Sequence, residues 1–191
     1  PGRRHLDFGS GVGVTSQVFL ETGWTSTMAD LSSTLLDFAR FRLERRGQVA
    51  TTVDLLDGEL PAGAYDAITA IDTLAHVPDV HETARTLHTA LGRDGVLVAN
   101  VDVRAATPET VWHLQDDEKR AAYDVLRAGF VHIGSMGYGL QAYRKVRAAG
   151  LRFRVRTLAQ WVGMAGPMRR VAVRASRRVL GGLWSVRERL R

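Results

Sequence analysis

The chain has 191 residues, of which 45% are hydrophobic and 24% charged, a composition typical of one globular domain with a substantial core. The absence of cysteine excludes disulfides and cysteine-ligated zinc, and no apolar run approaches the roughly 20 residues that a membrane-spanning helix needs. The formal net charge of +6 is uneven, because residues 152–191 hold eleven Arg and one acid, Glu188, whereas residues 1–151 carry −4.

Short apolar runs typical of strands alternate with helical patterns along the chain. The expected strands are 5–8, 25–29, 50–53, 65–71 and 95–101. The expected helices are 11–22, a second capped by Ser32 or Ser33 and reaching 46, 79–91, ended by Gly92, and 108–128, with Pro108 in its first turn. A hairpin of strands 130–135 and 138–145, joined around Gly137, comes last. This order predicts an α/β fold: a Rossmann-like, mostly parallel sheet with helices on both faces and a C-terminal antiparallel hairpin.

A glycine-rich loop follows the first strand and opens the first helix, where α/β sheets bind ligands. Its glycines are Gly9, Gly11 and Gly13. The dinucleotide fingerprint needs a glycine or alanine where Val14 stands, so the fit to a site for NAD(P) is imperfect. A phosphate-binding P-loop needs a Lys that this loop lacks. A purely structural turn is the remaining alternative.

The segment Asp7-Phe8-Gly9-Ser10-Gly11-Val12-Gly13 resembles motif I of the class I S-adenosylmethionine-dependent methyltransferases. The resemblance covers about residues 5–145, with further motifs in YDAITAIDTLAHVPD and LGRDGVLVANVD. It implies S-adenosyl-L-methionine as the cofactor. The loop residues Gly9, Ser10, Gly11 and Gly13 would then approach its amino-acid part and ribose, and Asp7 would serve its ammonium group.

The later strand ends complete the cofactor site that the resemblance implies. Asp30, beside Leu31, would accept both ribose hydroxyls. Asp54 would meet the adenine amino group while Leu55 flanks the ring, and Ile71 and Asp72 would lie under the methionine end. Each acid has an alternative role: Asp30 as a helix N-cap, and Asp54 or Asp72 as a residue that shapes a tight loop.

Two histidines are candidate catalytic residues, because an imidazole can remove a hydroxyl proton near neutral pH. His113 follows Trp112 beyond the fifth strand, and His76 follows the fourth strand. Their alternatives are a solvated helix residue and a residue that shapes the pocket. We expect no metal site, because the acidic run 116–118 is more typical of a solvated helix face.

The expected function is methyl transfer to a small-molecule acceptor, with oxygen preferred. A glycan, a lipid-linked molecule or a specialised metabolite would suit. The residues Ile71-Asp72-Thr73-Leu74 lack the Pro-Pro-aromatic motif that accompanies amino-group methylation of bases. The alternatives are an NAD(P)-dependent oxidoreductase and a non-catalytic nucleoside-binding module of the same fold.

We expect two parts, a cofactor-binding domain over 1–150 and an Arg-rich amphipathic tail over 151–191. Residues 167–191 could contact a membrane surface or a subunit, whereas no motif for sequence-specific nucleic acid is present. The composition, rich in Arg over Lys, favours a bacterial source, and we expect a cytoplasmic protein that can lie at the periphery of a membrane. Because the sequence starts with Pro1, we expect a preceding segment outside it.

Overall fold

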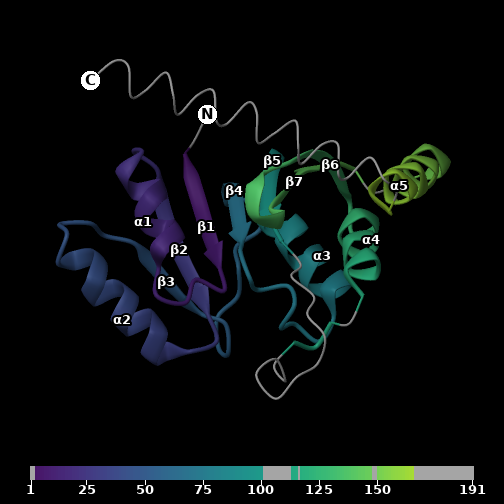
Figure 1. Cartoon of the computed structure of the whole chain (residues 1–191). Helices are drawn as coiled ribbons and strands as arrows, with labels where there is room; N and C mark the ends of the chain where they lie inside the picture. Colours follow the sequence, from purple (N-terminus) through teal and green to yellow (C-terminus); the bar gives the residue numbers. More distant parts are fainter. Residues whose placement is uncertain (1–2, 101–112, 116, 148–149, 166–191) are drawn as a thin grey trace, which may run out of the picture.

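The computed structural model describes residues 3–100, 113–115, 117–147 and 150–165, which form one sheet flanked by helices (Figure 1). Within this part the sheet has seven strands in the order β3-β2-β1-β4-β5-β7-β6. They are β1 (Arg4–Phe8), β2 (Thr25–Asp30), β3 (Thr51–Asp54), β4 (Tyr65–Ala70), β5 (Leu91–Ala99), β6 (Phe130–Ser135) and β7 (Gln141–Lys145). The first five strands are parallel, and β7 lies antiparallel between β5 and β6. The predicted fold class is confirmed.

Helices cover both faces of this sheet. They are α1 (Val14–Glu21), α2 (Ser33–Glu44), α3 (Val80–Ala90), α4 (Glu118–Arg127) and α5 (Gly150–Ala165). Adjacent residues of a strand point to opposite faces, and β2 shows both layers. Met28 packs with Leu36 and Leu43 of α2, whereas Ala29 belongs to the larger core with Leu87 of α3 and Val125 of α4.

The first helix is shorter than the sequence predicted, because the glycines before it adopt left-handed backbone angles. α1 begins at Val14, after Gly11 (φ 50°) and Gly13 (φ 73°). Helix α2 begins as expected, since the Ser32 side chain accepts a hydrogen bond from the Leu35 N–H (3.3 Å). The first turn of the predicted helix is therefore part of the glycine loop.

Gly92 does not end α3 in the predicted manner. The helix ends at Ala90, and β5 starts at once with Leu91. The pairing of β5 with β4 then shifts register, and Asp94 within that irregularity has φ 60°. The predicted turn is therefore a bulge inside the strand.

The helix predicted over 108–128 begins ten residues later among the described residues. Asp117 caps α4 by accepting hydrogen bonds from the backbone N–H groups of Lys119 (2.8 Å) and Arg120 (3.2 Å). Residues 113–115 are not helical, because they bind the segment after β4. Pro108 lies outside the described residues.

Helix α5 packs against α4 and β6. The Trp161 indole N–H donates to the Lys119 carbonyl (3.1 Å), and the Gln160 side chain bonds both the N–H and the carbonyl of His132 (3.2 and 3.0 Å). In the part of the chain that the structure covers, no helix is both long and apolar enough to cross a bilayer. Residues 166–191 lie outside that part, so the amphipathic helix expected there stays a prediction.

Candidate functional site

The glycine loop folds back tightly over the carboxyl end of β1. The N–H groups of Gly9 and Ser10 both donate to the Ala29 carbonyl (2.8 and 3.2 Å). Gly9 has φ 69°, and a Cβ atom placed there would lie 2.4 Å from the Thr73 side chain. At Gly11 an added Cβ would meet nothing within 4 Å. Position 9 therefore requires glycine, whereas the space beside Gly11 is open.

Asp30, at the end of β2, holds the loop in place. Its Oδ2 accepts from the Gly11 N–H (2.9 Å), and its Oδ1 accepts from the Ser32 N–H (3.0 Å). The side chain that caps α2 belongs to Ser32, so the alternative role of Asp30 as the N-cap is wrong. Each carboxylate oxygen can accept a further hydrogen bond, and Asp30 lines the adjoining cavity.

A closed ring of five buried polar side chains lies beneath the loop. Asp7 accepts from Ser16 through Oδ2 and from Thr69 through Oδ1 (3.0 and 3.1 Å). His5 contacts Thr69 and Ser26 (both 2.8 Å), and the Ser26 hydroxyl donates to the Ser16 hydroxyl (3.0 Å). Burial raises the pKa of Asp7, although bonds from Ser16 and Thr69 oppose this, and burial lowers the pKa of His5 to about 3.

The turn after β4 is held by a residue that sequence reasoning missed, Asn100. The Asp72 N–H donates to Asn100 Oδ1 (2.7 Å), and the Asn100 amide donates back to Asp72 Oδ1. Asp72 adopts φ 53°, a left-handed conformation that is rare for a non-glycine residue. The Thr73 hydroxyl donates to the Phe8 carbonyl (3.1 Å), which ties this turn to β1.

The structure brings the two candidate catalytic histidines together. The ring centroids of His76 and His113 are 4.8 Å apart, and the rings meet edge to face at 79°. The Ala75 carbonyl accepts from the Leu114 N–H (2.8 Å), which fixes the segment that carries His113. His113 Nδ1 is buried and has no hydrogen-bond partner among the described residues.

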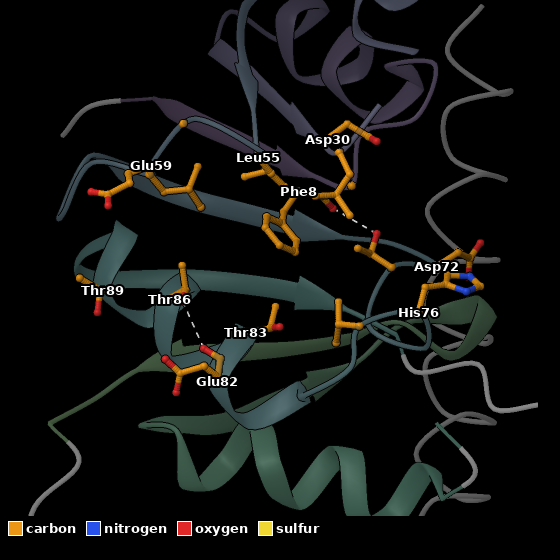
Figure 2. Close-up of a pocket in the computed structure, with 16 residues that line it drawn as sticks. Phe8, Asp30, Leu55, Glu59, Asp72, His76, Glu82, Thr83, Thr86 and Thr89 are labelled. Atoms are coloured by element: carbon orange, nitrogen blue, oxygen red, sulfur yellow. Dashed lines mark hydrogen bonds between the residues drawn. The ribbon is translucent and has the colours of Figure 1, made fainter. Parts of the chain in front are cut away.

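These elements border a cavity of about 790 Å³ between the sheet and α3. Figure 2 shows Asp72 and His76 at one end and Glu59 and Thr89 at the other. Six predicted site residues line it: Gly9, Asp30, Leu31, Leu55, Asp72 and His76. The lining also includes residues that the sequence did not single out, on the loop after β3 and on α3: Gly58, Glu59, Leu60, Glu82, Thr83, Thr86 and Thr89.

Other predicted cofactor residues lie outside the lining of this cavity. Asp54 Oδ1 accepts from the Leu56 N–H (2.9 Å), the local turn that was its alternative role. The Leu55 N–H donates to the Asp30 carbonyl (2.9 Å), so β3 positions Leu55 at the cavity. Ser10 Oγ is buried with no hydrogen-bond partner among the described residues, which leaves a hydroxyl in the loop for a ligand. Asp7, Gly11, Gly13 and Ile71 do not line the cavity.

The lining of the cavity suits a cationic nucleoside ligand. Four carboxylates line it, from Asp30, Glu59, Asp72 and Glu82, and the lining has no Lys or Arg. Phe8 and Leu55 offer apolar surface for a flat ring. In the described part of the chain, no three His or acidic side chains gather to hold a metal ion.

Comparison with known proteins gives matches to methyltransferases. A family model described as a methyltransferase domain matches residues 1–166. A ubiquinone biosynthesis O-methyltransferase from Xanthomonas campestris pv. campestris (strain B100) is 37% identical over 101 residues, which cover 51% of this chain and 42% of that protein. The match thus spans less than half of that relative's length.

Solved structures share the fold at low identity. An S-adenosylmethionine-dependent methyltransferase from Mesorhizobium loti superposes with a TM-score of 0.60 at 20% identity, covering 75% of this chain and 92% of that one. Phosphoethanolamine N-methyltransferase 2 from Haemonchus contortus, in complex with phosphomonomethylethanolamine and S-adenosylhomocysteine, gives 0.58 at 20% identity, covering 68% and 33%. These likenesses concern the arrangement of strands and helices.

Proposed function

Because the chain belongs to the class I S-adenosyl-L-methionine-dependent methyltransferase family, we propose that it methylates a hydroxyl oxygen of a small-molecule acceptor. S-adenosyl-L-methionine is the cofactor. The observation that carries the oxygen acceptor is the His76–His113 pair, with His76 on the cavity wall. The name of the Xanthomonas relative also favours oxygen.

Different residues of the cavity suit the ribose, the adenine ring and the ammonium group of the cofactor. Asp30 has acceptor capacity left for the two ribose hydroxyls, and Leu55 lies next to it for the adenine ring. Asp72, oriented by Asn100, would meet the ammonium group. The Ser10 hydroxyl, which has no hydrogen-bond partner among the described residues, would supply a further polar contact from the loop. Asp7 and Asp54 do not line the cavity and would support these residues through the ring beneath the loop and the turn after β3.

When bound, the cofactor would supply a methyl group on a positively charged sulfur, with a neutral thioether as the leaving group. His76 would take the proton of the acceptor hydroxyl as that oxygen receives the methyl group. The imidazole would then carry the positive charge. His113 positions His76 and belongs to the same proton-accepting pair, and alignment of the three reacting atoms supplies much of the acceleration.

The test uses the full chain in two steps. Calorimetry should show tight binding of S-adenosyl-L-methionine and its demethylated product, with no comparable binding of NAD. Methyl transfer to a panel of hydroxyl acceptors should then fall about 10²–10⁴-fold in His76→Asn, with cofactor affinity retained. His81→Asn is the matched control, because His81 bonds the Asp124 carbonyl on α4 and does not line the cavity.

Each alternative predicts a different outcome. Preference for NAD would favour the oxidoreductase. Cofactor binding without transfer to any acceptor would favour the non-catalytic module. Transfer that is unchanged in His76→Asn and in His113→Asn would contradict the proton-accepting pair, and acceptance of amines alone would contradict the oxygen acceptor.

We propose a glycan, a lipid-linked molecule or a specialised metabolite as the acceptor, in the cytoplasm. The 167–191 tail, with eight Arg and one Glu, is proposed to contact an anionic membrane or a subunit. Removing it should abolish that contact in vesicle sedimentation or in sedimentation velocity.

A further inference from the structure

Helix α5 exposes a continuous apolar stripe. Leu151, Val155, Leu158 and Val162 are 77%, 59%, 54% and 59% exposed. Their spacing of four, three and four residues places them on one face of the helix. A helix of 16 residues is about 24 Å long, so the stripe extends over most of it.

The rest of the molecule already occupies the other side of α5. Thr157 is buried, the Trp161 indole bonds the Lys119 carbonyl, and Gln160 bonds the backbone of His132. Figure 1 shows α5 at the margin of the molecule, beside α4. These contacts fix the orientation of α5, so the stripe faces away from the core.

Charge decides what kind of partner the stripe fits. Arg152, Arg154 and Arg156 are exposed, and α5 has no acidic residue. At 100° per residue Arg154 lies on one edge of the stripe, and Arg152 and Arg156 lie toward the other. A second copy of α5 would bring Arg against Arg, whereas an anionic surface would pair with all three and with the basic sequence of residues 166–191.

A cavity of about 550 Å³ between α4 and α5 adjoins the stripe through Leu158. Arg127 and Arg154 line it, although Arg127 also lies 3.6 Å from Asp124. The Thr157 hydroxyl lines it too, and it is buried with no hydrogen-bond partner among the described residues. Two guanidinium groups and an unused hydroxyl form a donor set for a phosphate oxygen.

We propose that α5 docks the protein on an anionic phospholipid surface. The stripe of Leu151, Val155, Leu158 and Val162 enters the interfacial layer, and a lipid phosphate occupies the cavity between Arg127 and Arg154. This inference is independent of the methyl acceptor.

The experiment is vesicle co-sedimentation with the full chain. Wild type should pellet with phosphatidylcholine vesicles that contain about 30% phosphatidylglycerol, and far less with phosphatidylcholine alone. Leu151→Gln/Val155→Gln should lower the partition coefficient about tenfold or more, because two exposed apolar side chains no longer enter the interface. Val49→Gln is the matched control, since Val49 is 80% exposed near β3, far along the sheet order from α5.

The second arm separates the lipid from other partners. Arg154→Gln should lower binding to anionic vesicles about threefold or more, and inorganic phosphate should not compete at moderate concentration. Competition by phosphate alone would assign the cavity to a free anion and overturn the headgroup role. Unchanged pelleting of Leu151→Gln/Val155→Gln would overturn the stripe's role. So would a dimer in sedimentation velocity that this variant dissociates without affecting vesicle binding.

Discussion

Asp30 is the residue on which the proposed cofactor site depends most. It ties the glycine loop to the start of α2 through two hydrogen bonds of 2.9 and 3.0 Å, and it is proposed to accept two ribose hydroxyls. Hydrogen bonds to a charged group contribute roughly 1.5–3 kcal/mol each. Asp30→Ala should therefore weaken cofactor binding by about 3–6 kcal/mol, or roughly 10²–10⁴-fold.

The assay is calorimetry with S-adenosyl-L-methionine and with its demethylated product, at a temperature where a urea titration shows the variant to be folded. Asp30→Asn keeps one acceptor oxygen and should fall between wild type and Asp30→Ala. Asp37→Ala is the control, because the Asp37 side chain is 68% exposed and pairs with Arg40 on the surface of α2. Affinity within about twofold of wild type for folded Asp30→Ala would refute the ribose role.

Two further predictions concern stability. Gly9→Ala should destabilise the fold by about 1–3 kcal/mol more than Gly47→Ala in urea, because both glycines have φ 69° but only Gly9 would place its Cβ against Thr73; equal losses would show that the loop relaxes without strain. The pKa of His5 is lowered in the folded state, so on acidification the unfolded chain takes up the imidazole proton at a higher pH than the folded chain does. Stability should therefore fall from about pH 6.5 toward pH 5, by up to about 1.4 kcal/mol per pH unit. The raised pKa of Asp7 has the opposite effect on stability at the acid end. His5→Gln should flatten this slope in denaturant titrations at each pH, and an unchanged slope would contradict the role of His5.

The sequence predicted most of the sheet because its strands carry local signals. The parallel strands are short segments that combine apolar with β-branched residues, and the acids Asp30 and Asp54 end β2 and β3 as the pattern predicts. The helix over 108–128 was placed too early because Pro108 is a local start signal. Asp117, followed by residues with good helix propensity, is a second such signal, and it is the one the described structure uses.

The contacts across the sheet could not be predicted in the same way. Asn100 meets Asp72 only because β4 and β5 are neighbours, and a separation of 28 residues carries no periodic signal. His76 and His113 were singled out separately, and their contact depends on the path of residues 113–115 along the Ala75 carbonyl. Local patterns thus located individual residues, whereas the tertiary structure decided which of them act together.

The ring beneath the glycine loop also couples four elements of the fold. Five hydrogen bonds join His5 and Asp7 of β1 with Ser16 of α1, Ser26 of β2 and Thr69 of β4. Because the ring is closed, removal of any one side chain leaves two buried neighbours short of a hydrogen bond, at a cost of about 1–3 kcal/mol for each. The floor of the site is therefore held as one unit, whereas Asp30 and Asp72, which line the cavity, stand outside this ring.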